Sequence, residues 1–190
     1  VGALFEQLVP DFRQIAYSTP SDYVQKIWTL YQQKAEQDNN LNGKFFECIL
    51  ATLCVREGLL PAFLSAKVAF VPNVIYDLMF YTPERGPICL SIKTSLRERY
   101  KQADLEAIAL KYVHRKALAY LITLHEKEAL SVQQKIETGD VIGLDAVIVA
   151  TSPEFDALIE KIKQFKLTVP PTVAVISSNQ VITVEKVARL

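Results

Sequence analysis

The stretch that decides the fold reads Asp77-Leu-Met-Phe-Tyr-Thr-Pro-Glu-Arg-Gly-Pro-Ile-Cys-Leu-Ser91-Ile-Lys93. Its two apolar runs, 74–81 and 87–92, are separated by Thr-Pro-Glu-Arg-Gly, whose proline and glycine are typical of a tight turn. The pattern predicts a β-hairpin. Because side chains alternate along a strand, Ser91 and Lys93 should share one face of the second strand. We therefore expect Asp77 and Lys93 to lie on adjacent strands and on the same face.

Another acidic residue follows the hairpin. Twelve residues separate Lys93 from Glu106, which a following helix would bring toward the same point. Phosphodiester hydrolysis needs a divalent metal held by carboxylates, a group that orients or deprotonates a water, and positive charge near the phosphate. Asp77 and Glu106 are suitable oxygen ligands for Mg²⁺, and Lys93 suits the water-orienting role.

This pattern resembles the PD-(D/E)XK, or restriction-endonuclease-like, nucleases. It is most similar to the type II restriction enzymes in which the second acid has moved from the strand to the helix. In the commoner form that acid stands two residues before the lysine, a position that is Ser91 here. Asp77, Ser91-Ile-Lys93 and Glu106 fit the spacing Asp … Ser-x-Lys-x12-Glu, over a resemblance that covers roughly residues 42–150. One departure is that Asp77 follows tyrosine and not proline.

The resemblance implies an α/β fold with an αβββαβ core, in which helices flank a central mixed sheet. It implies a catalytic set of Asp77, Lys93 and Glu106, with Ser91 in the vacated acid position, and Asp77 and Glu106 as the Mg²⁺ ligands. In this family the first core helix often supplies a further glutamate, and Glu47 is the matching residue here. A surface position for Glu47 is an equally good interpretation, because the same helix carries Lys44 and Arg56.

The triplet Arg97-Glu98-Arg99 resembles the recognition segment of enzymes in this branch that read CCGG or CC-NN-GG sites. Arginine matches guanine O6 and N7 with two hydrogen bonds, and a carboxylate accepts from cytosine N4. Lys101 would be a phosphate contact that positions the DNA without specifying sequence. Double-strand cleavage at a palindrome calls for a two-fold symmetric homodimer on double-stranded DNA.

Each feature also has a simpler explanation. Asp77 and Lys93 could form a cross-strand ion pair on a solvated face, Glu106 could be a surface helix residue, and 97–101 a solvated loop and helix start. Their joint order and spacing favour a Mg²⁺-dependent, sequence-specific DNA endonuclease of type II. Two alternatives stay open: a repair or mobile-element nuclease that reads DNA structure, and a DNA-binding protein whose site is dead because Ser91 replaces the acid.

Composition limits the function classes less than the motif does. The chain has 190 residues, half of them hydrophobic, which predicts a single folded domain with a sizeable core. Its formal net charge is zero, so DNA binding would require a local basic patch. Residues 93–116 offer seven positive side chains against three negative ones, although a helix with mixed surface charge explains them equally well.

The three cysteines lie in apolar runs and are interpreted as small buried hydrophobes of a reduced protein. None has a second Cys or His at metal-ligand spacing, which makes zinc an unfavourable choice. No apolar run is long enough to span a membrane, and no basic segment precedes a signal core. A cytoplasmic protein with no membrane partner is the expectation.

Periodicity and turn residues divide the chain into an N-terminal helical arm (1–40), a catalytic core (41–150) and a C-terminal αββ extension (151–190). The arm could contact DNA or a second subunit, but packing on the core is the better explanation. Helices are expected at 3–16, with a break at Pro10, and at 21–36, 43–57, 100–126 and 153–165; strands are expected at 66–70, 74–81, 87–93, 144–150, 172–176 and 180–184.

Overall fold

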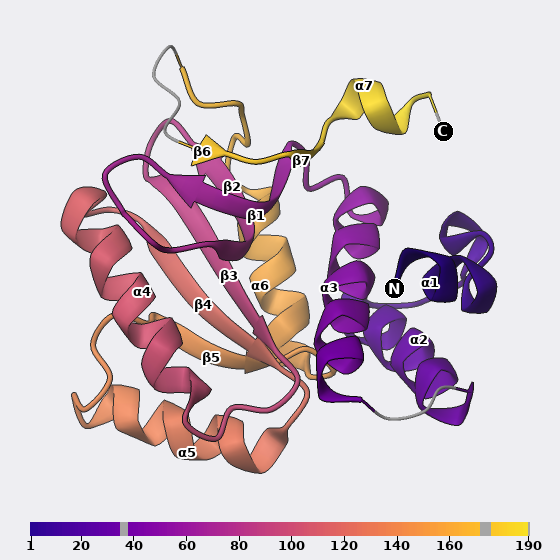
Figure 1. Cartoon of the computed structure of the whole chain (residues 1–190), viewed down its shortest axis with the longest axis horizontal. Helices are drawn as coiled ribbons and strands as arrows, with labels where there is room; N and C mark the ends of the chain where they lie inside the picture. Colours follow the sequence, from indigo (N-terminus) through magenta and orange to yellow (C-terminus); the bar gives the residue numbers. More distant parts are fainter. Residues whose placement is uncertain (35–37, 172–175, 190) are drawn as a thin grey trace.

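The computed structural model describes residues 1–34, 38–171 and 176–189 (Figure 1). Helices and strands alternate through most of the chain. In sequence order they are α1 (Gly2–Leu8), η1 (Phe12–Gln14), α2 (Pro20–Lys34), α3 (Asn39–Arg56), β1 (Ala62–Val68), β2 (Tyr76–Thr82), β3 (Gly86–Lys93), α4 (Arg99–Val113), β4 (Leu118–Thr123), α5 (Glu126–Glu137), β5 (Ala146–Val149), α6 (Pro153–Lys163), β6 (Ile176–Ser177), β7 (Gln180–Ile182) and α7 (Val184–Val187).

The strands of the described residues form one mixed sheet of seven, in the order β5-β4-β3-β2-β1-β6, with β7 also paired to β1. β1, β2 and β3 are antiparallel neighbours, whereas β3, β4 and β5 run parallel. β6 and β7 both pair antiparallel with β1. The chain is therefore mixed α/β, as the sequence predicts, and β3 stands at the centre where the antiparallel and parallel halves meet.

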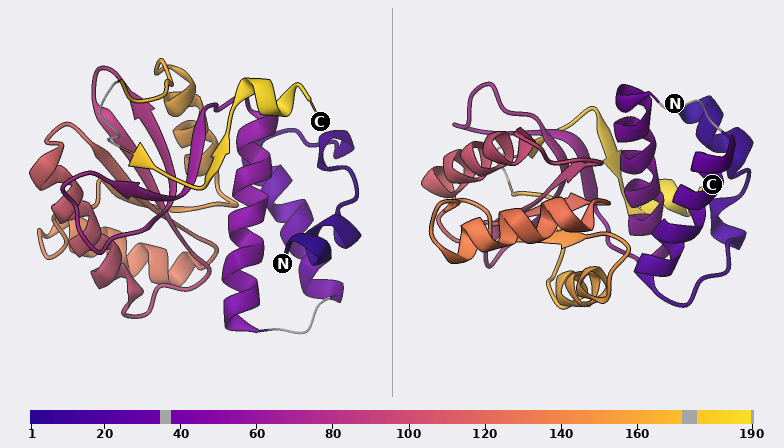
Figure 2. Two further views of the ribbon diagram at one scale, coloured as in Figure 1. Left: turned by 45° about the horizontal axis from the view of Figure 1, so that its top comes forward. Right: turned by 90° about the horizontal axis from the view of Figure 1, so that it is seen from below.

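Helices cover both faces of the sheet. One face packs with α4 and α5 through residues such as Met79, Cys89 and Leu121, and the other packs with α3 and α6 through Leu78 and Leu90. Figure 2 shows α4 and α5 on one side of the sheet and α6 on the other. Because β3 is buried on both faces, it is apolar along nearly its whole length.

The N-terminal helices pack on the core. Phe5, Tyr23, Ile27 and Tyr31 are buried in the same cluster as the inner face of α3. The Tyr31 ring stacks on Phe45 of α3 with ring centroids 4.1 Å apart, a geometry that aromatic pairs favour. Figure 1 shows α1 and α2 on the far side of α3 from the sheet. The structure therefore supports the interpretation that residues 1–34 pack on the core.

The predicted hairpin is confirmed. β2 and β3 pair antiparallel with Leu78 opposite Leu90 and Thr82 opposite Gly86. Gly86 has φ of 76°, a conformation that glycine adopts without steric cost, and its place after Pro83-Glu-Arg85 closes the turn. The alternation along both strands sends neighbouring side chains to opposite faces of the sheet.

The predicted helix over 100–126 is confirmed as far as Val113 and is wrong beyond it. α4 ends at Val113, and 118–123 is the buried central strand β4. An apolar run without proline or glycine fits a helix or a fully buried strand equally well by periodicity. Leu105 and Tyr112, expected on the buried face, are exposed; Ala103, Ala107 and Leu110 face the sheet instead. The amphipathic helix α5 was also missed, because its segment was interpreted as a connection.

Several predicted boundaries shift. α3 begins at Asn39, four residues before the expected start, because the Asp38 carboxylate and not Asn42 caps it by accepting from Leu41 N. β1 begins at Ala62, earlier than the predicted strand at 66–70. Most of the predicted strand at 172–176 and the end of the predicted helix at 21–36 lie outside the described residues, and the short helix α7 was not expected.

Along the described ranges, no helix is both long enough and apolar enough to cross a membrane.

Candidate functional site

Asp77 and Lys93 form an ion pair on one face of the hairpin. Lys93 Nζ donates to Asp77 Oδ2 at 2.6 Å, and the backbone N–H of Ile92 donates to the same oxygen at 2.7 Å. The strand register explains the meeting, because Leu78 pairs with Leu90 and continuing by one pair sets Asp77 opposite Ser91. In the described part of the chain, Asp77 Oδ1 accepts no hydrogen bond. One carboxylate oxygen is thus held by the protein, on a side chain that is 19% exposed.

Glu106, the third residue of the predicted catalytic set, lies in the middle of α4. Its Oε1 accepts from Gln102 Nε2 at 2.8 Å, one helical turn earlier. Burial raises the pKa of the Glu106 carboxyl, and the charge of Asp77 adds to the rise, whereas Gln102 and Lys93 oppose it. The charges of Asp77 and Lys93 both influence the pKa of Glu106, but among the described residues no hydrogen bond or ion pair joins Glu106 to either of them.

A polar groove of about 260 Å³ is lined by Lys93, but not by Asp77 or Glu106. It lies where the N-terminal parts of α3 and α4 meet the end of β3. The lining residues are Asn39, Asn40, Gly43, Lys44, Glu47, Ile92, Lys93, Thr94, Arg99 and Gln102. Three of them are cationic and one is anionic; Lys44 is paired with Glu47 and Lys93 with Asp77, so within the described residues Arg99 is the cationic lining residue without an ion-pair partner.

Glu47 faces this groove from α3. Lys44 Nζ contacts both of its carboxylate oxygens, at 2.9 and 3.2 Å. The hydrogen bond to Glu47, and the more distant charge of Asp77, raise the pKa of Lys44 above its usual value although burial opposes them. Glu47 therefore lies at the groove as the resemblance implied, and it also has the surface ion-pair partner that the simpler explanation required.

Ser91 does not line the groove. It is buried, and it acts on the neighbouring Cys89 thiol, whose pKa burial raises and Ser91 lowers. The position that holds an acid in the commoner form of the site is therefore filled here by a small hydroxyl packed under α4.

The predicted recognition triplet spans the junction between the β3–α4 loop and α4, because Glu98 is the N-cap residue and Arg99 begins the helix. Leu96 is fully buried and fixes this loop, and its N–H donates to Glu128 of α5. The next residue, Arg97, has φ of 37°, and Arg97, Glu98 and Arg99 are all exposed. Arg99 also lines the groove. The loop is thus anchored on one side while its charged side chains point outward beside Lys93.

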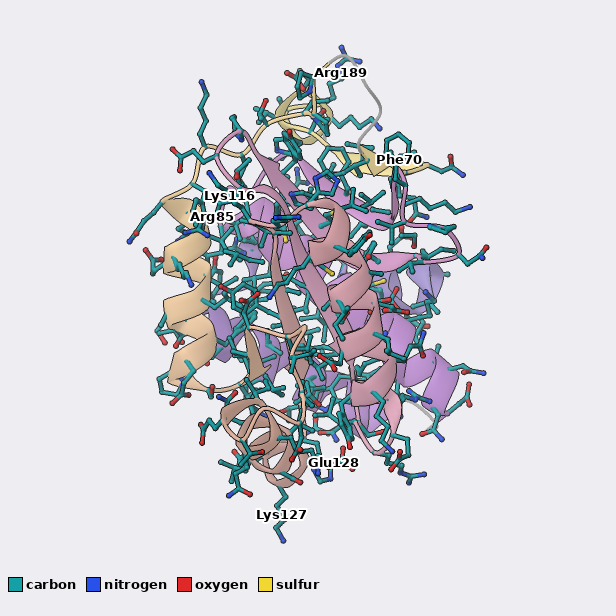
Figure 3. The ribbon with its side chains drawn as sticks, turned by 90° about the vertical axis from the view of Figure 1, so that its left-hand side faces the viewer. Phe70, Arg85, Lys116, Lys127, Glu128 and Arg189 are labelled. Carbon is teal, nitrogen blue, oxygen red and sulfur yellow. The ribbon has the colours of Figure 1, made fainter. Side chains whose placement is uncertain are left out.

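The basic stretch 93–116 does not form one patch. Lys101 is paired with Glu98 near the loop, whereas Lys111 is paired with Asp145 at 2.8 Å. Figure 3 shows Lys116, together with Arg85 of the hairpin turn, at the opposite end of the molecule from Glu128, which binds the loop. α4 spans 15 residues, and at about 1.5 Å of rise per residue its two ends are separated by roughly 20 Å.

Metal-ligand chemistry at the site is limited to carboxylates. Within residues 1–34, 38–171 and 176–189, no group of three or more His, Cys, Asp or Glu side chains is arranged to hold a metal ion. Cys54 and Cys89 are buried and Cys48 is partly buried, and all three are free thiols. A metal at this site would rely on the pair Asp77 and Glu106, completed by water and ligand oxygens.

Sequence reasoning missed several residues that line the groove, among them Asn39, Asn40, Lys44, Thr94 and Gln102. Gln102 carried a usable signal, because a glutamine four residues before a glutamate on a helix is within hydrogen-bonding reach. The asparagines carried none, since they were interpreted as loop and their position depends on how α3 packs against β3.

Comparison of the chain with protein-family models, with curated proteins and with solved structures finds no match.

Proposed function

We propose that the protein is a Mg²⁺-dependent, sequence-specific DNA endonuclease with a restriction-endonuclease-like core. The observation that carries the proposal is the Asp77–Lys93 pair at the carboxyl end of β3, whose charges affect the pKa of Glu106, with a polar groove lined by Lys93. An acid, a lysine and a second acid are the parts that phosphodiester hydrolysis requires.

The element order supports the same proposal. α3 is followed by three antiparallel strands, by α4, and by β4 parallel to β3. That is the αβββαβ order of the resembled core, with β4 in the place that the sequence had given to 144–150. α5 and β5 then extend the parallel half of the sheet.

The donor set fits Mg²⁺, because this ion is commonly held by one or two carboxylates with water and phosphate at the other positions. Asp77 and Glu106 would be the two protein ligands. When bound, the ion would supply positive charge to the phosphate and acidify a bound water. Lys93 would orient the attacking water and stabilise the charge that develops on the phosphate, and Glu47 would be an outer carboxylate.

Recognition would come from the exposed loop. The exposed Arg97 and Arg99 would present guanidinium groups to guanine, and the Glu98–Lys101 ion pair would open so that Glu98 accepts from cytosine and Lys101 contacts phosphate. These groups fit a CC-GG type palindrome, cut by a homodimer on double-stranded DNA. Such an enzyme would act in the cytoplasm, where its three free cysteines stay reduced.

The test is incubation of the purified protein with unmethylated plasmid or phage DNA, in Mg²⁺ and in EDTA, followed by electrophoresis. Discrete fragments in Mg²⁺ alone, with ends that map to a C·G-rich palindrome, are the expected result. A smear in Mg²⁺ would replace the proposal with a structure-directed repair or mobile-element nuclease.

A second candidate is a DNA-binding protein with an inactive site. Two observations favour it: Ser91 is buried where the commoner site has an acid, and the described residues contain no three-ligand metal group. Intact DNA in both tubes, with a mobility shift on a gel, would establish this candidate and exclude the enzyme.

A further inference from the structure

A second groove, of about 580 Å³, runs along the free edge of the sheet. The strand at this edge is β5, which pairs on one side only, with β4. α5 and α6 form the walls, and the lining residues are Glu126, Ala129, Leu130, Gln133, Ala146, Val147, Ile148, Val149, Ser152 and Glu154. Leu130 is 67% exposed, although it stands on a helix that packs against β5. This groove shares no lining residue with the polar groove at Lys93.

The groove-side backbone of β5 is partly satisfied within the chain, because Val147 N–H donates to Gln133 and Val149 O accepts from Ser152 N at 3.0 Å; among the described residues, Val147 O and Val149 N–H are the groups left for a neighbouring strand. Val147 donates its N–H to the side-chain oxygen of Gln133 at 3.3 Å, so its backbone is directed away from β4. Alternation along the strand directs Val149 the same way, and Ala150 N accordingly bonds to Thr123 O of β4. The Gln133 amide thus supplies the acceptor that a neighbouring strand would provide. β5 also lacks the proline, lysine or bulge with which proteins usually block an open edge.

The two acidic residues that line the groove, Glu126 and Glu154, lie at the same end of it. Glu126 begins α5 just after β4, and Glu154 lies in the first turn of α6 just after β5, so both stand at the carboxyl end of β5. No cationic residue lines the groove, and in the part of the chain that the structure describes neither carboxylate has an ion-pair partner. The nearby Lys127 points outward from α5 (Figure 3).

We propose that this groove binds an extended segment of a partner protein, which adds to β5 as a further strand. Its backbone would pair with Val147 and Val149, its apolar side chains would cover Leu130 and Ala129, and a lysine or arginine would meet Glu126 and Glu154. A second copy of the chain does not fit equally well, because antiparallel pairing of β5 with itself would add a second pair of carboxylates to each groove.

The test uses a fluorescent peptide of alternating valine and threonine with two lysines at each end, added to the whole protein and followed by anisotropy. The expected result is saturable binding. A peptide with glutamates in place of the lysines, and one with proline at alternate positions, should each bind about tenfold more weakly, because the first loses the charge match and the second the N–H donors.

Matched variants locate the binding. Leu130→Asp, and the double variant Glu126→Gln with Glu154→Gln, should each weaken lysine-peptide binding about tenfold. Leu105→Asp is the control, because Leu105 is also 67% exposed but stands on α4. Equal affinity for the lysine and glutamate peptides, or unchanged binding by Leu130→Asp, would overturn the proposal. Concentration-dependent dimerisation that Leu130→Asp abolishes would also overturn it, in favour of a second copy.

Discussion

Two aspartate–lysine pairs stand at opposite ends of the same sheet. Asp77 Oδ2 accepts from Lys93 Nζ at 2.6 Å and from Ile92 N at 2.7 Å. Asp145 Oδ2 accepts from Lys111 Nζ at 2.8 Å and from Ala119 N at 2.7 Å. The side chains are 19% and 19% exposed in the first pair, and for Lys111 and Asp145 24% and 32% in the second. In local geometry the two pairs are nearly the same.

Their surroundings differ. The charges of Asp77 and Lys93 act on a further carboxylate, Glu106, and Lys93 faces a groove with Lys44 and Arg99. Lys111 and Asp145 line neither groove, and their pair ties the end of α4 to the strands β4 and β5. A half-buried aspartate–lysine pair is therefore not itself a functional signal, whether it joins two strands or a helix and a loop, and the neighbouring groups give the first pair its proposed chemistry.

The largest expected difference between the pairs is in DNA cleavage. Lys93→Ala should lower the cleavage rate in Mg²⁺ by about a thousandfold or more, because it removes the charge that stabilises the transition state. Lys111→Ala should leave the rate within about twofold. Both rates are measured as nicking of supercoiled plasmid, with circular dichroism to confirm folding. Equal cleavage rates for the two variants would contradict the catalytic role proposed for Lys93.

The next difference is in DNA binding at the two ends of α4. Arg97→Ala should weaken binding to the cleavage site by about tenfold or more, the effect of losing one bidentate contact of about 1–3 kcal/mol. Lys116→Ala, at the other end, should change it less than about twofold. Affinities are compared by mobility shift in Ca²⁺. A larger loss of affinity in Lys116→Ala than in Arg97→Ala would indicate that DNA binds at the other end of α4.

Breaking either pair should lower the free energy of unfolding by about the same amount. Lys93→Ala and Lys111→Ala each remove one partner of a half-buried ion pair and leave the aspartate with its backbone N–H, at an expected cost of about 1 kcal/mol. Urea unfolding of each variant against the parent measures this cost. A much larger loss for Lys111→Ala would show that its pair supports the fold more strongly than the geometry indicates.

The smallest effect concerns Glu106. Burial raises the pKa of this carboxyl above its ordinary value of 4.5, so the folded state binds the proton more tightly than the unfolded one and loses stability as the pH rises through that range. Glu106→Gln carries no charge and should melt slightly higher than the parent near pH 7. The difference should vanish below pH 4.5. Glu6→Gln, at an exposed position, is the control, and a lower melting temperature for Glu106→Gln near pH 7 would contradict the prediction.

The parts of the fold that sequence predicted are those with a local signal. The hairpin has two apolar runs around a proline–glycine turn, and α6 has Pro153 at its start with an apolar face behind it. The error at 118–123 arose because a strand buried on both faces has no alternation. α5 had a signal that was not used, since Glu126 and Glu128 lie in its first turn as the helix dipole favours.

The candidate site likewise contains residues that had a local sequence signal and residues that had none. Spacing along the chain predicted Asp77, Lys93 and Glu106; strand register joins the first two in an ion pair, and α4 places Glu106 where their charges affect its pKa. The contribution of Lys44 and Gln102 to the groove depends on how α3 and α4 pack against the end of β3. No short-range pattern encodes that packing.

The sequence by itself determined the hairpin, its turn and the position of the acid–lysine pair on one face, because these depend on alternation and on a few neighbouring residues. The tertiary structure alone decided where α4 ends, which of the basic residues gather beside Lys93, and that β5 is left as an open edge. Those outcomes depend on burial against elements distant in sequence, and burial selects among local conformations that the sequence leaves nearly equal.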